Sequence, residues 1–290
     1  MNMYNDQAEN LRKKMEKRSK HKHAKTIAVV SGKGGVGKSN FTLNFALSLA
    51  QKEKSVLIVD LDIGMGNIDI LLGLQAKQSI VQMYENNLSI HDIIEKGPHA
   101  LAYIAAGSGL SEVFSMSEEK FNYFLEQFDQ ITYDYDYIFF DMGAGATHDS
   151  LFYILAADQC FVVTTPEPTA MMDAYAMVKH IYLRNPELPF YLVVNRSESF
   201  KDGKMIMKRL QKVIEQFLSK SITPLGIIPY DKVISRAVVQ QIPFTLFDSR
   251  AQASKAVNQI ATQYLTDSIN INKKTSSTFI TKLKKFMTER

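Results

Sequence analysis

The chain alternates short apolar runs with longer segments whose apolar residues recur at helical spacing. Six runs of four or five residues are almost wholly apolar: Thr26–Val30, Val56–Val59, Tyr137–Phe140, Cys160–Thr164, Tyr191–Val194 and Leu225–Ile228. Such runs fit strands that are buried on both faces of a parallel sheet, and most of the intervening segments are long enough for crossover helices. The pattern predicts an α/β fold, a doubly wound and mostly parallel sheet flanked by helices.

The two ends of the chain differ from this central pattern. Residues 1–24 carry seven Lys or Arg against three acidic residues, whereas residues 25–268 hold the strands and helices. Residues 269–277 are rich in Asn, Lys, Ser and Thr and predict a linker, and residues 278–290 form a short basic amphipathic stretch. We therefore expect one central domain with a flexible N-terminal segment and a C-terminal helix on a linker.

The amino-acid composition excludes several classes of protein. Hydrophobic residues make up 46% of the chain, which is enough for a sizeable core, and the net charge is +4. The first residues lack the apolar centre of a signal peptide, and no apolar stretch approaches the ~20 residues that cross a bilayer. Cys160 is the one cysteine, so we expect a buried thiol, no internal disulfide and no paired-cysteine metal site. These features predict a soluble cytoplasmic protein.

A glycine-rich loop follows the first apolar run and has the residue types that bind nucleotide phosphates. It satisfies Gly-x4-Gly-Lys-Ser/Thr between a predicted strand and a predicted helix. Glycines let backbone N–H groups approach phosphate oxygens, and the helix N-terminus adds partial positive charge. Lys38 is expected to reach the β- and γ-phosphates of ATP and the Ser39 hydroxyl to ligate Mg²⁺. The predicted ATP-binding residues here are Gly32, Lys33, Gly34, Gly35, Val36, Gly37, Lys38, Ser39 and Asn40.

Three aspartates follow apolar runs at positions where a parallel sheet binds its ligands. Asp60 and Asp62 come directly after Val59 and Leu61, and Asp141 follows the run that ends at Phe140. The carboxyl ends of such strands face the ligand crevice. Asp141 is interpreted as a Walker B carboxylate, and the glycine-rich residues after it as a switch that responds to the γ-phosphate. For all three aspartates, simple helix or turn capping is the alternative.

Lys33, the second residue of the loop, makes the chain resemble the deviant Walker A family, which includes MinD, ParA and the nitrogenase iron protein. The resemblance implies an ATP-bound homodimer in which Lys33 reaches the partner's phosphates, as an arginine finger does. It implies that Lys33, Lys38 and Asp62 are catalytic, with Asp62 positioning the attacking water. It also implies a metal site at Ser39, Asp60 and Asp141, a dimer contact at Asp173, and an adenine pocket at Asn195, Arg196, Pro229, Tyr230 and Asp231.

The C-terminal stretch indicates which members of this family the chain resembles most. An apolar helical face is formed by Phe279, Ile280, Leu283, Phe286 and Met287, and it is flanked by Lys282, Lys284 and Lys285. Such a helix suits an anionic membrane surface, and MinD ends similarly. A helix docked on its own domain is the alternative. Members that carry metal clusters need paired cysteines, which this chain lacks.

The N-terminal segment resembles that of the FlhG (YlxH) family, MinD-like regulators of flagellar number and placement. The resemblance lies in Asp6-Gln7-Ala8-Glu9-Asn10-Leu11-Arg12, and it implies that Asp6, Gln7, Ala8, Leu11 and Arg12 bind and activate the GTPase FlhF. It also implies contacts with the C-ring proteins of the flagellar basal body. A solubilising charged tail is the alternative reading of this segment.

The combined prediction is a MinD-like ATPase that dimerises with ATP and Mg²⁺ and attaches reversibly to the inner face of the cell membrane. It would control flagellar number and placement, partly by stimulating FlhF. A MinD-type division-site ATPase and a ParA-type DNA-partition ATPase remain as alternatives. Nucleic acid is not an expected partner.

Overall fold

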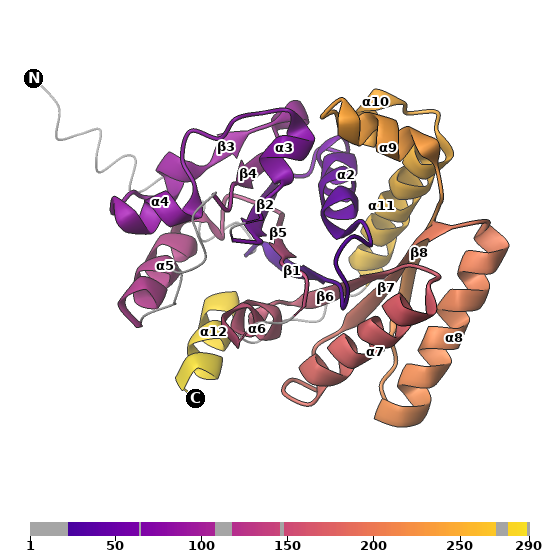
Figure 1. Ribbon diagram of the computed structural model, residues 1–290. Helices are drawn as coiled ribbons and strands as arrows, with labels where there is room; N and C mark the ends of the chain where they lie inside the picture. The colour runs from indigo at the N-terminus through magenta and orange to yellow at the C-terminus, as the bar shows by residue number, and fades with distance from the viewer. Residues whose placement is uncertain (1–22, 64, 108–117, 146–147, 271–277, 289–290) are drawn as a thin grey trace, which may run out of the picture.

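The computed structural model describes residues 23–63, 65–107, 118–145, 148–270 and 278–288. An eight-stranded sheet in the order β3-β4-β2-β5-β1-β6-β7-β8 forms the middle layer, and helices cover both of its faces (Figure 1). Along the described chain every strand pairing is parallel except that of β3 with β4. The predicted doubly wound α/β fold is confirmed.

All six apolar runs are strands, and each strand is longer than the run that predicted it. Their bounds are β1 (Lys25–Val30), β2 (Val56–Leu61), β5 (Tyr137–Met142), β6 (Gln159–Thr164), β7 (Phe190–Ser197) and β8 (Thr223–Pro229). β2, β5 and β7 are longer because Asp60, Asp141 and Asn195 continue the strand at the carboxyl edge, whereas β1 and β6 begin one residue earlier than their runs. Two strands were not predicted, β3 (Glu95–Lys96) and β4 (Ala102–Ile104), since two or three residues are too few to show a period.

The helices divide between the two faces of the sheet, and each face has its own apolar core cluster. One face carries α5 (Glu118–Ile131), α6 (His148–Ala156), α7 (Pro168–Tyr182), α8 (Phe200–Leu218) and α12 (Phe279–Thr288). The other carries α2 (Lys38–Ala50), α3 (Ile68–Leu72), α9 (Lys232–Val239), α10 (Phe244–Phe247) and α11 (Gln252–Asn270). Alternate residues of one strand serve the two clusters, as Phe140 and Phe139 of β5 do, because side chains alternate across a strand.

Shorter elements complete the described chain, and one predicted boundary was wrong. Between β2 and β4 lie α4 (Ile80–Glu85) and two 3₁₀ turns, η1 (Ile90–Ile93) and η2 (Pro98–Ala100). The linker was expected to begin at residue 269, but α11 continues to Asn270. No Pro or Gly interrupts the sequence after Tyr264, so the helical hydrogen bonding continues.

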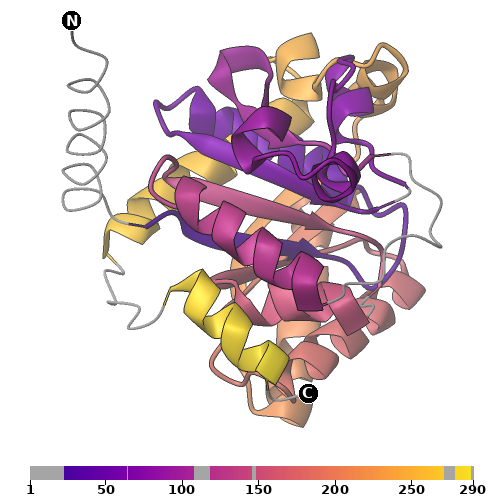
Figure 2. The ribbon, with the colours of Figure 1, turned by 90° about the vertical axis from the view of Figure 1, so that its left-hand side faces the viewer.

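Helix α12 packs on its own domain, beside α6 and α5 (Figures 1 and 2). The Phe279 ring stacks on Phe140 at 4.9 Å between centroids and lies 5.2 Å from Phe128 of α5. Leu283 is fully buried, and Lys282 Nζ lies 2.6 Å from Asp158 Oδ1. The apolar face therefore meets the protein core, which is the alternative that the sequence left open.

Some predicted residues cannot be placed from the described part of the chain. Outside it lie the residues of the FlhG-like N-terminal motif, Asp6, Gln7, Ala8, Leu11 and Arg12, and the side chain of Met287. The described helices include none with the length and apolar character needed to cross a bilayer.

Candidate nucleotide site

The glycine-rich loop connects β1 to α2 and fits tightly between neighbouring elements. Gly37 has φ 88°, in the left-handed region, and a Cβ there would lie 2.4 Å from Asn195 Nδ2. A Cβ on Gly32 would lie 2.1 Å from the backbone oxygen of Asp173 in α7. Both positions therefore require glycine, because a side chain would collide with β7 or α7. The loop is the turn that was predicted, held between two later elements of the chain.

Lys38 and Asp141 form a buried ion pair at the start of α2. Lys38 Nζ lies 2.8 Å from Asp141 Oδ1, and the side chains are 7% and 0% exposed. The Thr42 hydroxyl donates a second hydrogen bond to the same oxygen at 2.9 Å, and Ser39 Oγ lies 3.3 Å from Lys38 Nζ. The structure thus brings the predicted Walker A lysine and Walker B aspartate together, although 103 residues separate them. Thr42 was not predicted, because a threonine inside a helix carries no motif.

The other oxygen of Asp141 supports a magnesium site. Oδ2 is buried and has no hydrogen-bond partner among the described residues. Such an acceptor is costly unless a cation or donor meets it. Within the described chain no three His, Cys, Asp or Glu side chains gather as a metal site. Mg²⁺ binds one or two protein oxygens and completes its shell with phosphates and water. Asp141 and the Ser39 hydroxyl are the residues that fit it.

Asp60 caps the segment that leads into α3. Its Oδ1 accepts the N–H of Asp62 at 3.0 Å, and its Oδ2 accepts the N–H groups of Asn67 at 2.9 Å and Ile68 at 3.2 Å. Burial, and then the neighbouring Asp141, raise the pKa of Asp60 to about 7. The structure therefore gives Asp60 the capping role that was one of its two readings. Its place beside Mg²⁺ stays a prediction.

Asp62 lies at the carboxyl edge of the sheet, against the glycine-rich switch. Its Oδ1 would be 3.0 Å from a Cβ on Gly143, two residues after Asp141. Burial raises the pKa of Asp62, Lys38 opposes that shift, and Asp141 adds to it. A half-buried carboxylate that senses both members of the buried pair can orient a water beside the phosphates. Its role in positioning water stays a prediction.

Lys33 is held by the N-terminus of α7 in its own chain. Its Nζ lies 2.9 Å from Glu167 Oε2 and 3.3 Å from Thr169 Oγ1, and the two ion-pair side chains are 43% and 59% exposed. The pair lowers the pKa of Glu167. Exposed pairs contribute little to stability, so Lys33 can leave Glu167 for another anion. Glu167 was not predicted as a partner; its place before Pro168, at a helix start, is the signal that could have indicated it.

The predicted adenine residues gather at or just beyond the carboxyl ends of β7 and β8. Asn195 is already engaged: its Nδ2 donates to the Val36 carbonyl at 2.8 Å and its Oδ1 accepts the Arg196 N–H. Asp231 caps α9 by accepting the Val233 N–H at 2.9 Å. Tyr230 is 57% exposed and is available to cover a base. Base contacts by these residues and by Pro229 stay predictions.

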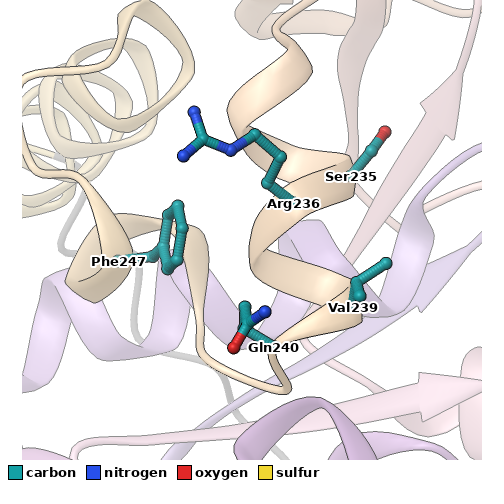
Figure 3. A pocket seen from close by; sticks show the side chains of 5 residues that line it. All are labelled: Ser235, Arg236, Val239, Gln240 and Phe247. Atoms are coloured by element: carbon teal, nitrogen blue, oxygen red, sulfur yellow. The ribbon is translucent and has the colours of Figure 1, made fainter.

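A separate hollow lies between α9 and α10 (Figure 3). It has a volume of about 370 Å³ and is lined by Ser235, Arg236, Val239, Gln240 and Phe247. The Arg236 guanidinium lies 5.7 Å from the centre of the Phe247 ring. A single cation over an aromatic ring offers no cradle of backbone N–H groups. This hollow therefore lacks the features of a phosphate site, and phosphate binding at the glycine-rich loop stays a prediction.

Comparison with known sequences agrees with this geometry. The ParA family, described as NUBPL iron-transfer P-loop NTPase, matches residues 22–265. The antiactivator FleN of Pseudomonas aeruginosa is 32% identical over 235 residues, which cover 81% of this chain and 84% of FleN. The flagellum site-determining protein YlxH of Helicobacter pylori is 30% identical over 271 residues, 91% of each chain. The septum site-determining protein MinD of Helicobacter pylori is 32% identical over 84% of this chain and 91% of its own.

Solved structures show the same fold. In the MinC:MinD cell division protein complex of Aquifex aeolicus, the matching chain is 25% identical, with a TM-score of 0.68 over 84% of this chain and 96% of that one. MinD of Pyrococcus horikoshii, solved with Mg-ADP, is 22% identical with a TM-score of 0.67, over 87% of this chain and 99% of that one.

Proposed function

Because this chain belongs to the MinD and ParA family of P-loop ATPases, we propose that it is a MinD-like ATPase whose ATP-bound dimer attaches to the membrane and controls flagellar number and placement. The observation that carries the proposal is the buried Lys38–Asp141 pair with its unpartnered Asp141 oxygen. The flagellar part rests on FleN and YlxH, which match over most of their lengths. Cluster transfer is not proposed, because the one cysteine, Cys160, is fully buried.

Nucleotide binding would exchange the partners of the buried pair. Lys38, which pairs with Asp141 in this structure, would turn to the β- and γ-phosphates, because these carry more negative charge than one carboxylate. Asp141 and Ser39 would hold Mg²⁺, and the bound ion would supply charge neutralisation at the phosphates. Because Asp141 lies near the end of β5, two residues before Gly143, this exchange can alter the glycine-rich switch.

Dimerisation would cover the face around the loop. Three large apolar side chains near it are exposed, Met65 by 74%, Met172 by 64% and Tyr230 by 57%, and a second copy would remove them from water. Lys33, released from Glu167, would reach the partner's phosphates. Asp62 would orient the water that attacks the γ-phosphate, and hydrolysis would return monomers.

Membrane attachment would depend on undocking α12. The face that suits lipid includes Phe279 and Leu283, which are buried against the domain, so the docked helix cannot use it. We assign the docked arrangement to the detached state. Release exposes the helix, and two helices on one dimer bind a membrane by avidity where one would bind weakly.

The Lys282–Asp158 pair gives a test of this arrangement. Lys282→Gln should raise binding to anionic vesicles in the absence of nucleotide about five- to tenfold, because it removes a charge-assisted hydrogen bond from the docked helix. Lys282→Arg is the matched control, since it keeps a cation at the same position that can pair with Asp158. Co-sedimentation with vesicles measures both. If Lys282→Gln binds no better than the control, this pair does not hold α12 in the detached state.

The N-terminal segment separates the flagellar role from a division-site role, which the similarity to MinD keeps open. A synthetic peptide of residues 1–24 should raise GTP hydrolysis by an FlhF-type GTPase without the ATPase domain. Gln7→Ala or Leu11→Ala should weaken the effect, whereas rearranging the lysines outside Asp6–Arg12 should not. If the peptide leaves GTP turnover unchanged, or works equally well with Asp6–Arg12 scrambled, the segment is a basic tail and the flagellar assignment loses this support.

A further inference from the structure

The solvent face of α8 is strongly cationic. Five exposed Lys and Arg side chains lie between residues 201 and 212: Lys201, Lys204, Lys208, Arg209 and Lys212. The opposite side of the helix is buried through Gly203, Met207, Leu210, Ile214 and Leu218. The helix is therefore fixed to the sheet by one face and presents a dense row of positive charge on the other.

These charges are not neutralised within the described part of the chain. None of the five side chains has a hydrogen bond or ion pair there. Asp202, the acidic residue among them, is engaged by the Ser199 hydroxyl in capping α8. Lys204, Lys208 and Lys212 are spaced four apart, and like charges at this spacing repel one another and destabilise a helix. Such a row is relieved when an external anion covers it.

The position of α8 favours a lipid surface as that anion. Helices α12, α6, α7 and α8 contact one another in sequence across one face of the sheet, and α8 and α12 share one apolar core cluster (Figure 1). The docked α12 and the cationic row therefore lie on the same face of the sheet, with α6 and α7 between them. Met205, which is 61% exposed, lies among the cations, and an apolar side chain flanked by lysines suits the headgroup boundary.

We propose that the cationic face of α8 (Lys201, Lys204, Lys208, Arg209 and Lys212) is a second membrane contact, separate from α12, that binds anionic lipid headgroups when α12 is released. This rests on the membrane attachment in the proposed function. Helix α8 is expected to remain packed on the sheet when the protein binds a membrane. The packing is close, because a Cβ on Gly203 would lie 2.3 Å from the Ile227 side chain. Its contribution is electrostatic, so it requires anionic lipid and weakens with salt.

The test uses the full chain with Lys204→Gln, Lys208→Gln and Lys212→Gln combined. Each lysine near an anionic surface raises affinity about fivefold, so the triple variant should bind vesicles of equal phosphatidylglycerol and phosphatidylcholine about a hundredfold more weakly with ATP at low salt. The difference should shrink in high salt. The matched control replaces three lysines on the other face of the sheet with Gln. Lys52 and Lys54 follow α2, and Lys255 lies on α11. Glutamine keeps helix propensity, so both variants should fold, dimerise and hydrolyse ATP like the parent.

Each outcome decides between the two proposals. The α8 contact is overturned if the α8 triple variant binds vesicles like its control while the parent chain and the α12 variants behave as proposed. In that case the proposed function stands. A parent chain that binds no anionic vesicle with ATP overturns the membrane part of both. If the triple variant keeps vesicle binding but loses binding to duplex DNA, the row serves nucleic acid and the lipid proposal is wrong.

Discussion

Lys38→Ala is expected to abolish ATP-driven dimerisation and to lower ATP hydrolysis by about a thousandfold or more. The amine of Lys38 is the cation buried at the start of α2, and its removal leaves the phosphates without their closest counter-charge. The same change leaves Asp141 buried without its ion-pair partner, which costs roughly 3–5 kcal/mol of stability. Light scattering with and without ATP measures dimerisation, and phosphate release measures turnover.

The control must separate lost binding from lost folding. Lys33→Ala removes another lysine of the same loop, but its partner Glu167 is exposed, so folding and ATP binding by the monomer should survive. Thermal unfolding followed by circular dichroism reports the stability of both variants. A folded Lys38→Ala chain that still forms dimers with ATP would contradict the assignment of the phosphate site.

Asp62→Ala is expected to lower hydrolysis by about a hundred- to ten-thousandfold while ATP binding, dimerisation and vesicle attachment remain. The carboxylate lies beside Gly143 and outside the loop that wraps the phosphates, so its loss should affect the attacking water more than the bound nucleotide. The variant should therefore accumulate as an ATP-bound dimer on vesicles. Single-turnover hydrolysis, with co-sedimentation on vesicles under the same conditions, measures the two properties together.

Asp62→Asn gives the stricter comparison, because it keeps the shape of the side chain and removes its basicity. If hydrolysis depends on the carboxylate as a base, Asp62→Asn should be as slow as Asp62→Ala; if hydrogen-bond geometry is enough, it should retain part of the rate. Parent-like turnover in both variants would exclude Asp62 from the reaction.

The fold class and the phosphate loop could be predicted from the amino-acid sequence alone. Long apolar runs report strands that are buried on both faces, whatever they pack against, so β1, β2, β5, β6, β7 and β8 could be predicted. The loop could be predicted because its glycines and Lys38 lie within a few consecutive residues. The strands β3 and β4 escaped prediction because they are two and three residues long and show no period.

The partners of the site residues could not be predicted, because they depend on contacts between distant parts of the chain. Glu167 lies 134 residues from Lys33, and no local pattern connects them. The sequence around Asp60 is compatible with a metal ligand and with a helix cap. In the fold, both of its carboxylate oxygens accept hydrogen bonds from backbone N–H groups.

The position of the C-terminal helix also depends on contacts with distant parts of the chain. A stripe of apolar residues predicts that one face of α12 is buried. The same stripe is expected whether the helix packs on lipid or on the protein core. The aromatic surface formed by Phe128 and Phe140, and the anchor at Asp158, 124 residues from Lys282, place the helix on the domain. Periodicity fixes which side chains are buried, whereas the choice of what buries them depends on contacts between residues far apart in the chain.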